Sequence, residues 1–144
     1  MEPLVIHETY KTPSIIFKPD GELILKGRSI PESVYKLYSP AICWLEELTA
    51  ENVTFNINLE YINSASKVML LDVFRTIEFN DHIKSITVNW FYDSDDEEHV
   101  EIGKIFEEST NRSKFNYIAC RISERHWFSS LPLVVIANLA FARK

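Results

Sequence analysis

Glycine is scarce in this sequence, with 3 residues among 144. Loops that cradle nucleotide phosphates need glycine at fixed spacings, and neither GxGxxG nor GxxxxGK(S/T) occurs. The sequence therefore gives no support for a dinucleotide site or a P-loop nucleotide site.

Positive charge is also in short supply, since 15 Lys and Arg accompany 21 Asp and Glu, for a net charge of −6. Non-specific nucleic-acid binding relies on clustered Lys and Arg that neutralise phosphates, so we expect no nucleic-acid partner. The acidic residues concentrate between Asp93 and Glu108, where eight carboxylates accompany one lysine. This stretch alone outweighs the negative excess of the whole chain.

The cysteine and histidine spacings of metal and redox sites are absent as well. The two cysteines, Cys43 and Cys120, form no CxxC pair and lie among apolar residues, so we expect buried free thiols. The histidines show neither HxxxH nor HExxH spacing, and no GxSxG nucleophile motif occurs. We therefore predict no metal ligands, no cofactor and no catalytic residues.

No apolar run is long enough to cross a bilayer. The longest, Leu131–Ala142, has 12 residues and contains Pro132 and Asn138, whereas a spanning helix needs about 20. The start of the chain lacks the basic residues of a secretion signal. We expect a cytoplasmic protein without membrane insertion.

The N-terminal part of the chain predicts a β-hairpin. Ser14–Phe17 and Glu22–Leu25 are apolar and β-branched, and a Pro-Asp-Gly turn separates them. Residues 1–13 are typical of an irregular arm or a short strand. Gly27–Ser29 is expected to break the pattern after the hairpin.

The rest of the chain alternates between helix and strand patterns. Apolar residues spaced by three and four predict helices, and strict alternation predicts strands. In chain order these are a helix that opens at Pro31 and Glu32 and is kinked at Pro40, a strand over Val53–Tyr61, a helix over Val68–Ile77, a strand over Ile83–Tyr92, a helix over Val100–Glu108, a strand over Asn116–Ile122 and an optional helix at about 131–142. Alternating units of this kind imply parallel strands covered by helices. We predict one small α/β domain with a mixed sheet.

The segment Tyr61–Lys67 lies where a predicted strand ends and a helix begins, an edge at which ligands and partners meet α/β sheets. The strand pattern places Tyr61 on the apolar face. Asn63, Ser64 and Ser66 can cap the helix by accepting hydrogen bonds from its first N–H groups. Alternatively, a serine here could carry a phosphate, because free N–H groups and the positive end of the helix favour negative charge.

Two other segments are candidates for partner contacts. The acidic stretch Asp93–Glu98 could be a solvated loop, a divalent-metal site or a docking surface for a basic partner. The EF-hand pattern does not fit it, since Glu98 stands where that pattern needs glycine. Lys26–Glu32 forms a turn into a helix, and its Arg28 could pair with a nearby acid or contact a partner.

Three segments in order resemble the SiaC family of regulatory phosphoproteins. Gly27–Ser33 resembles its GxSYPEN-like stretch, Leu59–Lys67 its L-x-Y-x-N-T-S-S-x-K-like stretch, and Trp90–Asp93 with the following acids its W-Y-Y-D-x-D-D-E-like stretch. The resemblance implies a fold similar to STAS-type anti-sigma-factor antagonists. It also implies a regulatory domain over residues 1–122, with residues 123–144 as a C-terminal extension.

The resemblance further implies a partner switch. In that family a Ser/Thr kinase phosphorylates the hydroxyl residue after the Asn of the second stretch, and a PP2C-type phosphatase removes the phosphate. The unphosphorylated protein binds and stimulates a diguanylate cyclase, which links the switch to cyclic-di-GMP and biofilm behaviour. By motif match the phosphoacceptor here is Ser64, with Asn63, Ser66 and Lys67 shaping the site. The expected partner contacts are Tyr61, Arg28, Tyr92 and Asp93.

The sequence departs from the family pattern at the acceptor, where the family usually has Thr before a Ser. Ser64 keeps the hydroxyl, while Ala65 removes one alternative acceptor and leaves Ser66. Two other functions remain open, namely an adaptor in which Ser64 only caps a helix, and a metal-binding domain that uses the acidic loop. Three roles are open for Leu131–Ala142: packing on the sheet, covering a sheet edge, or contacting a second copy in a homodimer.

Overall fold

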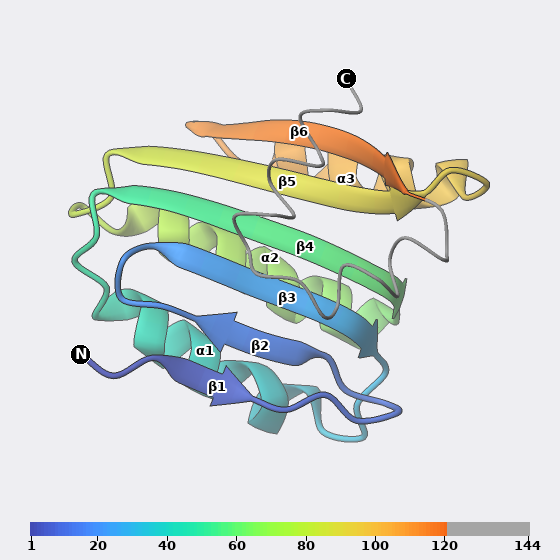
Figure 1. The fold of residues 1–144 in the computed structure, drawn as a ribbon, viewed down its shortest axis with the longest axis horizontal. Coiled ribbons are helices and arrows are strands. Elements are labelled where there is room, and N and C mark those ends of the chain that lie inside the picture. Colours follow the sequence, from blue (N-terminus) through green and yellow to red (C-terminus); the bar gives the residue numbers. More distant parts are fainter. Residues whose placement is uncertain (121–144) are drawn as a thin grey trace.

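The computed structural model describes residues 1–120, which form six strands and three helices (Figure 1). In chain order these are β1 (Leu4–Ile6), β2 (Ser14–Phe17), β3 (Glu22–Ser29), α1 (Val34–Glu46), β4 (Asn52–Ile62), α2 (Ser64–Phe79), β5 (Ser85–Asp93), α3 (Glu97–Glu108) and β6 (Ser113–Cys120). The alternation of strand and helix from β3 onward is the one that the apolar spacing predicts.

All six strands belong to one sheet, in the order β1-β2-β3-β4-β5-β6. β1, β2 and β3 pair antiparallel, and β3 to β6 pair parallel. Each crossover moves one strand further in the same direction, so right-handed connections place every helix on the same face. Figure 1 shows the three helices behind the sheet, with α1 toward the β1 edge and α3 toward the β6 edge. The predicted mixed α/β fold is confirmed, with β1 as an added edge strand.

The core lies between the helices and this face of the sheet. Alternate residues of the central strands point into it, as Leu23 and Leu25 of β3 do. Aromatic rings link the layers: Phe74 of α2 lies 5.6 Å from Phe55 of β4 and 5.3 Å from Phe106 of α3, measured between ring centroids. Burial of each such side chain contributes about 1.5–3 kcal/mol. This burial holds the helices on the sheet.

The C-terminal end of α2 is held by side chains from distant parts of the chain. Asn80 donates through Nδ2 to the carbonyl oxygens of Leu45 and Leu48, at 3.0 and 2.8 Å. Arg112 donates to carbonyl oxygens that include those of Glu78 and Asn80. Because a helix leaves its last carbonyls without internal partners, these donors stabilise its end. They fix α2 at the end far from its first turn.

A row of asparagines crosses the face of the sheet opposite the helices. Asn56 of β4, Asn89 of β5 and Asn116 of β6 stand in register. Asn116 Nδ2 donates to Asn89 Oδ1 at 3.0 Å, and Asn89 Nδ2 donates to Asn56 Oδ1 at 2.9 Å. The row links three parallel strands through side chains as well as through backbone. In the sequence, each of these asparagines alone indicates only a polar position of an alternating strand.

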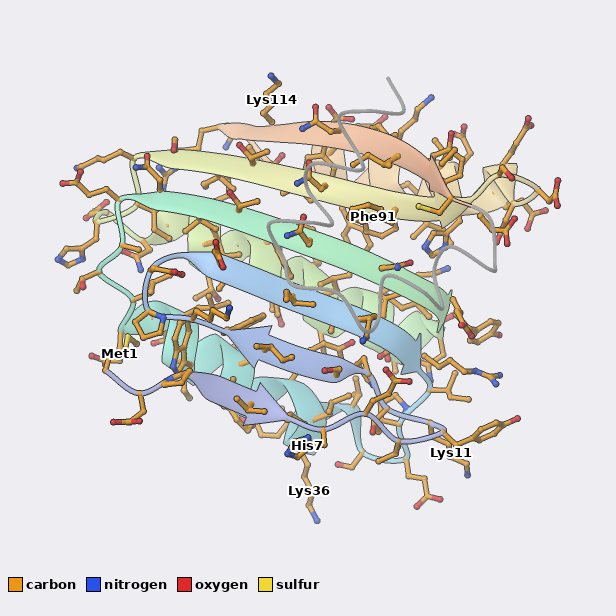
Figure 2. All side chains as sticks on the ribbon, in the orientation of Figure 1. Met1, His7, Lys11, Lys36, Phe91 and Lys114 are labelled. Atoms are coloured by element: carbon orange, nitrogen blue, oxygen red, sulfur yellow. The ribbon has the colours of Figure 1, made fainter. Side chains whose placement is uncertain are left out.

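Lys114 lies on β6, the strand at one end of the described sheet. It is exposed, and Figure 2 shows it projecting outward, on the opposite side of the molecule from Lys36 of α1. A charged side chain on such a strand opposes edge-to-edge pairing with another chain.

Several boundaries differ from the predicted ones. β3 continues through Gly27–Ser29 instead of breaking there, because Gly27 adopts a φ of +116° while the strand stays paired with β4. α2 begins at Ser64 and α3 at Glu97, since polar residues that carry no apolar signal form the first turn of each helix. β6 likewise begins earlier than predicted, at Ser113.

The prediction that both cysteines are buried is wrong for Cys43. Cys120 is 1% exposed, whereas Cys43 of α1 is exposed. Ala41 faces the sheet, and two helical positions further on the side chain turns to the opposite side of the helix. α1 itself begins at Val34, after the predicted start at Pro31.

The predictions for Leu131–Ala142, for the end of the last strand and for an extension over residues 123–144 fall outside the described residues. Within residues 1–120, none of the helices combines the length and the apolar character that crossing a membrane requires.

Candidate functional site

Near the end of β4, the pairing with β3 shifts by one residue, and this shift sets the direction of the side chains at the predicted site. β4 pairs regularly with β3 up to Leu59, and pairing resumes with Tyr61 opposite Arg28, so Glu60 has no partner residue on β3. An extra residue of this kind reverses the alternation of the side chains beyond it. Tyr61 is therefore 54% exposed, and Ile62 returns to the core. The prediction that Tyr61 lies on the apolar face is wrong.

Asn63 forms the turn between β4 and α2. Its Oδ1 accepts a hydrogen bond from the backbone N–H of Ser66 at 2.8 Å, which caps the helix. Its own N–H donates to the carbonyl oxygen of Ser29 at 3.0 Å, and its carbonyl accepts from the N–H of Lys67 at 3.0 Å. The helix cap is thus Asn63, and the interpretation of Ser64 as the cap is wrong.

Ser66 points into the protein and is fully buried. Its Oγ donates to the Ser29 carbonyl at 3.2 Å and accepts from the Ser29 hydroxyl at 2.8 Å. The Ser29 hydroxyl also lies 2.6 Å from the hydroxyl of Tyr38. Three buried hydroxyls therefore join β3, α1 and α2 beneath the turn, and each has a hydrogen-bond partner, as buried polar groups require.

Tyr38 remains protonated in this network at neutral pH. Burial raises the pKa of its hydroxyl to about 12, and the hydroxyls of Ser29 and Ser66 offset part of the rise. Ser29 lies in the Gly27–Ser33 stretch and Tyr38 in the apolar stripe of the first helix, but no sequence pattern indicated the contact between them, because it joins residues far apart in the chain.

Ser64 is the first residue of α2, and it is exposed. In the part of the chain that the structure describes, its hydroxyl makes no hydrogen bond, and the N–H groups of Ser64 and Ala65 have no acceptor. Unpaired N–H groups and the positive end of the helix dipole favour a negative group at this position. Lys67, three residues further along the helix, adds a positive charge nearby.

Within residues 1–120, Arg28 stacks on a tyrosine and forms no ion pair with an acid. Its guanidinium carbon lies 4.7 Å from the centroid of the Tyr10 ring, a cation–π contact. Arg28 also stands opposite Tyr61 on the neighbouring strand, and Tyr10 and Tyr61 are 75% and 54% exposed. Two predicted contact residues therefore lie side by side at the carboxyl ends of β3 and β4. Tyr10 lies beside them, and the sequence did not indicate it, because the arm before β2 carries no regular pattern.

The acidic segment after β5 is organised by local hydrogen bonds. Asp93 accepts from the N–H of Asp95 at 2.9 Å, and Asp96 caps α3 by accepting from the N–H of His99 at 3.3 Å. Tyr92, just before, is half-buried against the core. Among the described residues, no three His, Cys, Asp or Glu side chains converge where they could hold a metal ion. Tyr92 and Asp93 thus end the neighbouring strand β5, and their role as partner contacts stays a prediction.

Replacing the cap and replacing its exposed neighbour are expected to have different effects on stability. Asn63→Ala removes the acceptor of the Ser66 N–H and lowers the free energy of unfolding by about 1 kcal/mol. Ser64→Ala removes a hydroxyl without a hydrogen bond, so the change stays within about 0.5 kcal/mol. Urea unfolding followed by circular dichroism measures both. An equal loss in the two variants would make Ser64 a structural residue after all.

The buried network predicts a pH dependence in the alkaline range. The unfolded chain loses the Tyr38 proton near pH 10, whereas the folded chain holds it up to a pKa of about 12. The unfolded state then binds fewer protons than the folded state, so the free energy of unfolding falls as pH rises through this window. Tyr38→Phe is expected to reduce this slope by up to about 1.4 kcal/mol per pH unit. Urea unfolding at several pH values above 9 measures it, and an unchanged slope would contradict the buried placement of the hydroxyl.

The part of the chain that the structure describes is also the part that matches a known protein family. Residues 6–120 match the family described as SiaC family regulatory phosphoprotein. An uncharacterized protein of Pseudomonas aeruginosa strain UCBPP-PA14 is 29% identical over 115 residues, with 75% of this chain and 90% of that protein covered.

Solved structures show the same likeness. Apo-SiaC from Pseudomonas aeruginosa matches with a TM-score of 0.73 at 26% identity, covering 81% of this chain and 98% of that chain. A second match, in the crystal structure of the diguanylate cyclase SiaD in complex with its activator SiaC from the same organism, has a TM-score of 0.73 at 27% identity and covers 81% of this chain and 99% of that chain. With its three ordered sequence stretches and this shared fold, the chain belongs to the SiaC family of regulatory phosphoproteins.

Proposed function

We propose that this protein is a non-catalytic partner-switch regulator whose state is set by phosphate on Ser64. The unphosphorylated form binds and activates a diguanylate cyclase in the cytoplasm. A Ser/Thr kinase adds the phosphate, and a PP2C-type phosphatase removes it. One observation carries the proposal: of the two serines in the first turn of α2, Ser64 is exposed and has no hydrogen bond to any described residue, whereas Ser66 is buried and hydrogen-bonded.

Family membership supports the regulatory role, and a relative supports the choice of effector. SiaC of Pseudomonas aeruginosa, which shares this fold, is described as the activator of the diguanylate cyclase SiaD. By that likeness we assign a diguanylate cyclase to this chain as effector, with cyclic-di-GMP synthesis and biofilm behaviour as the output.

The groups around Ser64 are suited to stabilise a phosphate on its hydroxyl. The N–H groups of Ser64 and Ala65 have no acceptor among the described residues, and Lys67 lies within one helical turn. The phosphate carries a charge of about −1.5 to −2 at pH 7, which a helix N-terminus favours. The Asn63 cap and the buried hydroxyls need not move. The switch therefore changes the charge of a surface and leaves the fold intact.

The effector is expected to contact the exposed rings of Tyr10 and Tyr61 and the half-buried Arg28 beside this turn. Arg28 and Tyr61 are neighbours across β3 and β4, and Tyr10 lies against Arg28. Arginine and tyrosine are enriched among the residues that contribute most to binding at interfaces. Tyr61 lies two residues before Asn63, so a phosphate on Ser64 lies on the same surface as Tyr61. A partner bound to this surface contacts the added charge directly.

Neither alternative function has a specific observation in its favour. An adaptor in which Ser64 serves only as a cap would need the capping role that Asn63 fills. A metal-binding domain built on the acidic segment would need converging ligands, and residues 1–120 contain no such group.

The proposal is tested with Ser64→Asp and Ser64→Ala in the full chain, titrated against each diguanylate cyclase encoded in the same genome. Ser64→Ala is expected to bind and activate one of them as the unphosphorylated protein does. Ser64→Asp is expected to bind at least about tenfold more weakly, because it places fixed negative charge in the contact surface. Calorimetry measures binding, and cyclic-di-GMP synthesis measures activation.

Thr49→Asp provides the matched control, since it introduces the same charge at an exposed hydroxyl residue that follows α1, outside the Ser64 turn. It is expected to behave as the wild type. Equal binding of Ser64→Asp and Ser64→Ala to every cyclase would overturn the proposal.

A further inference from the structure

An apolar groove lies between α2 and α3 and begins close to Ser64. It has a volume of about 200 Å³, and its walls are Val68 and Leu71 of α2 and Ile102 and Ile105 of α3, with Phe106 among its lining residues. Val68 and Ile105 are each 63% exposed. Large apolar side chains that gather on a surface mark a site for a partner more often than isolated ones do.

The groove shares a helix face with the proposed phosphoacceptor. Ser64, Val68 and Leu71 follow one another at spacings of four and three residues, which places them on one side of α2. Lys67 lines the same groove. A group bound between the helices therefore lies one helical turn from the Ser64 hydroxyl.

The wall formed by α3 is strongly acidic. Glu98, Glu101 and Glu108 share the exposed face of α3 with Ile105, at spacings of three and four residues. Glu101 approaches Lys104 at 3.9 Å, and both side chains are more than half exposed, so solvent screens this pair and little of the negative charge is neutralised. The apolar groove thus has a row of carboxylates along one side.

From these features we infer that the groove receives an amphipathic helix of the effector, with an apolar stripe flanked by Lys or Arg on the side that meets α3. Apolar anchors at spacings of three and four residues fit a groove between two helices, which is the usual geometry of helix-in-groove recognition. The groove offers no strand edge, so an added β-strand does not fit it. The carboxylates of α3 select basic flanks by charge complementarity.

This inference rests on the proposed function for the identity of the partner and for the switch. A phosphate on Ser64 stands at the end of the groove, where a docked apolar segment would remove part of its water shell. Negative charge brought into an apolar interface weakens it through this desolvation cost. Phosphorylation of Ser64 is therefore expected to release the helix from the groove as well as the contacts at Arg28 and Tyr61.

The groove can be tested without any natural partner. The probe is a synthetic amphipathic helix of leucine and lysine, compared with the same helix carrying glutamate in place of lysine. Titration into the full chain, followed by amide NMR shifts, is expected to move the signals of α2 and α3 residues that line the groove with the lysine peptide only. Equal binding of both peptides, or shifts elsewhere, would overturn the charge selection and the groove.

The second test measures affinity for the cyclase. Val68→Ser and Ile105→Ser are each expected to weaken binding about tenfold, because they remove anchors at the centre of the interface, and Glu108→Lys is expected to weaken it through the lost charge. Phe79→Ser is the matched control, since Phe79 is an 82% exposed apolar residue of α2 outside this groove. Circular dichroism confirms that each variant is folded.

The outcomes separate this inference from the proposed function. If Ser64→Asp releases the cyclase while Val68→Ser and Ile105→Ser bind as the wild type does, the groove inference is wrong and the proposed switch is supported. If the groove variants weaken binding while Ser64→Asp and Ser64→Ala bind equally, the groove inference is supported and the proposed switch is wrong. If the groove variants alter self-association and leave cyclase affinity unchanged, the occupant is a second copy and the inference is overturned.

Discussion

The hydrogen bonds of Asn63 determine the rest of the site. Its Oδ1 accepts from the N–H of Ser66, and its own N–H donates to the carbonyl of Ser29, so the first turn of α2 is tied to the end of β3. With the turn held in this way, Ser66 points inward to the hydroxyls of Ser29 and Tyr38, and Ser64 is left on the surface. The difference between a structural serine and an accessible one therefore follows from a single cap.

The surfaces around Ser64 depend on the same turn. On one side, the unpaired Glu60 turns Tyr61 outward beside Arg28. On the other side, α2 runs from Ser64 past Val68 into the groove with α3. In the proposed switch, a charge added at Ser64 therefore lies next to two surfaces at once. This arrangement fits the proposed switch between partners.

Sequence patterns predicted the fold because apolar spacing reports directly on burial, as in the strands and helices from Val53 to Glu108. They also placed Ser64 at a strand-to-helix junction. They failed where a contact joins distant residues, as in the Ser29–Tyr38–Ser66 network, and where one extra residue reversed a strand, as at Tyr61. Cys43 was misplaced because its neighbours in sequence are apolar while its position on the helix turns it to solvent. The choice between Ser64 and Ser66 required the structure, since both are serines in the same turn.

The measurement that tests the central claim most directly is mass-spectrometric mapping of phosphate on the full chain. The protein is purified from its own cells after deletion of the phosphatase gene, and fragmentation separates Ser64 from Ser66. We expect one phosphate, on Ser64, because its hydroxyl is exposed at the start of α2 while Ser66 is buried. A phosphate on Ser66, or no phosphate on this turn in cells without the phosphatase, would contradict the claim.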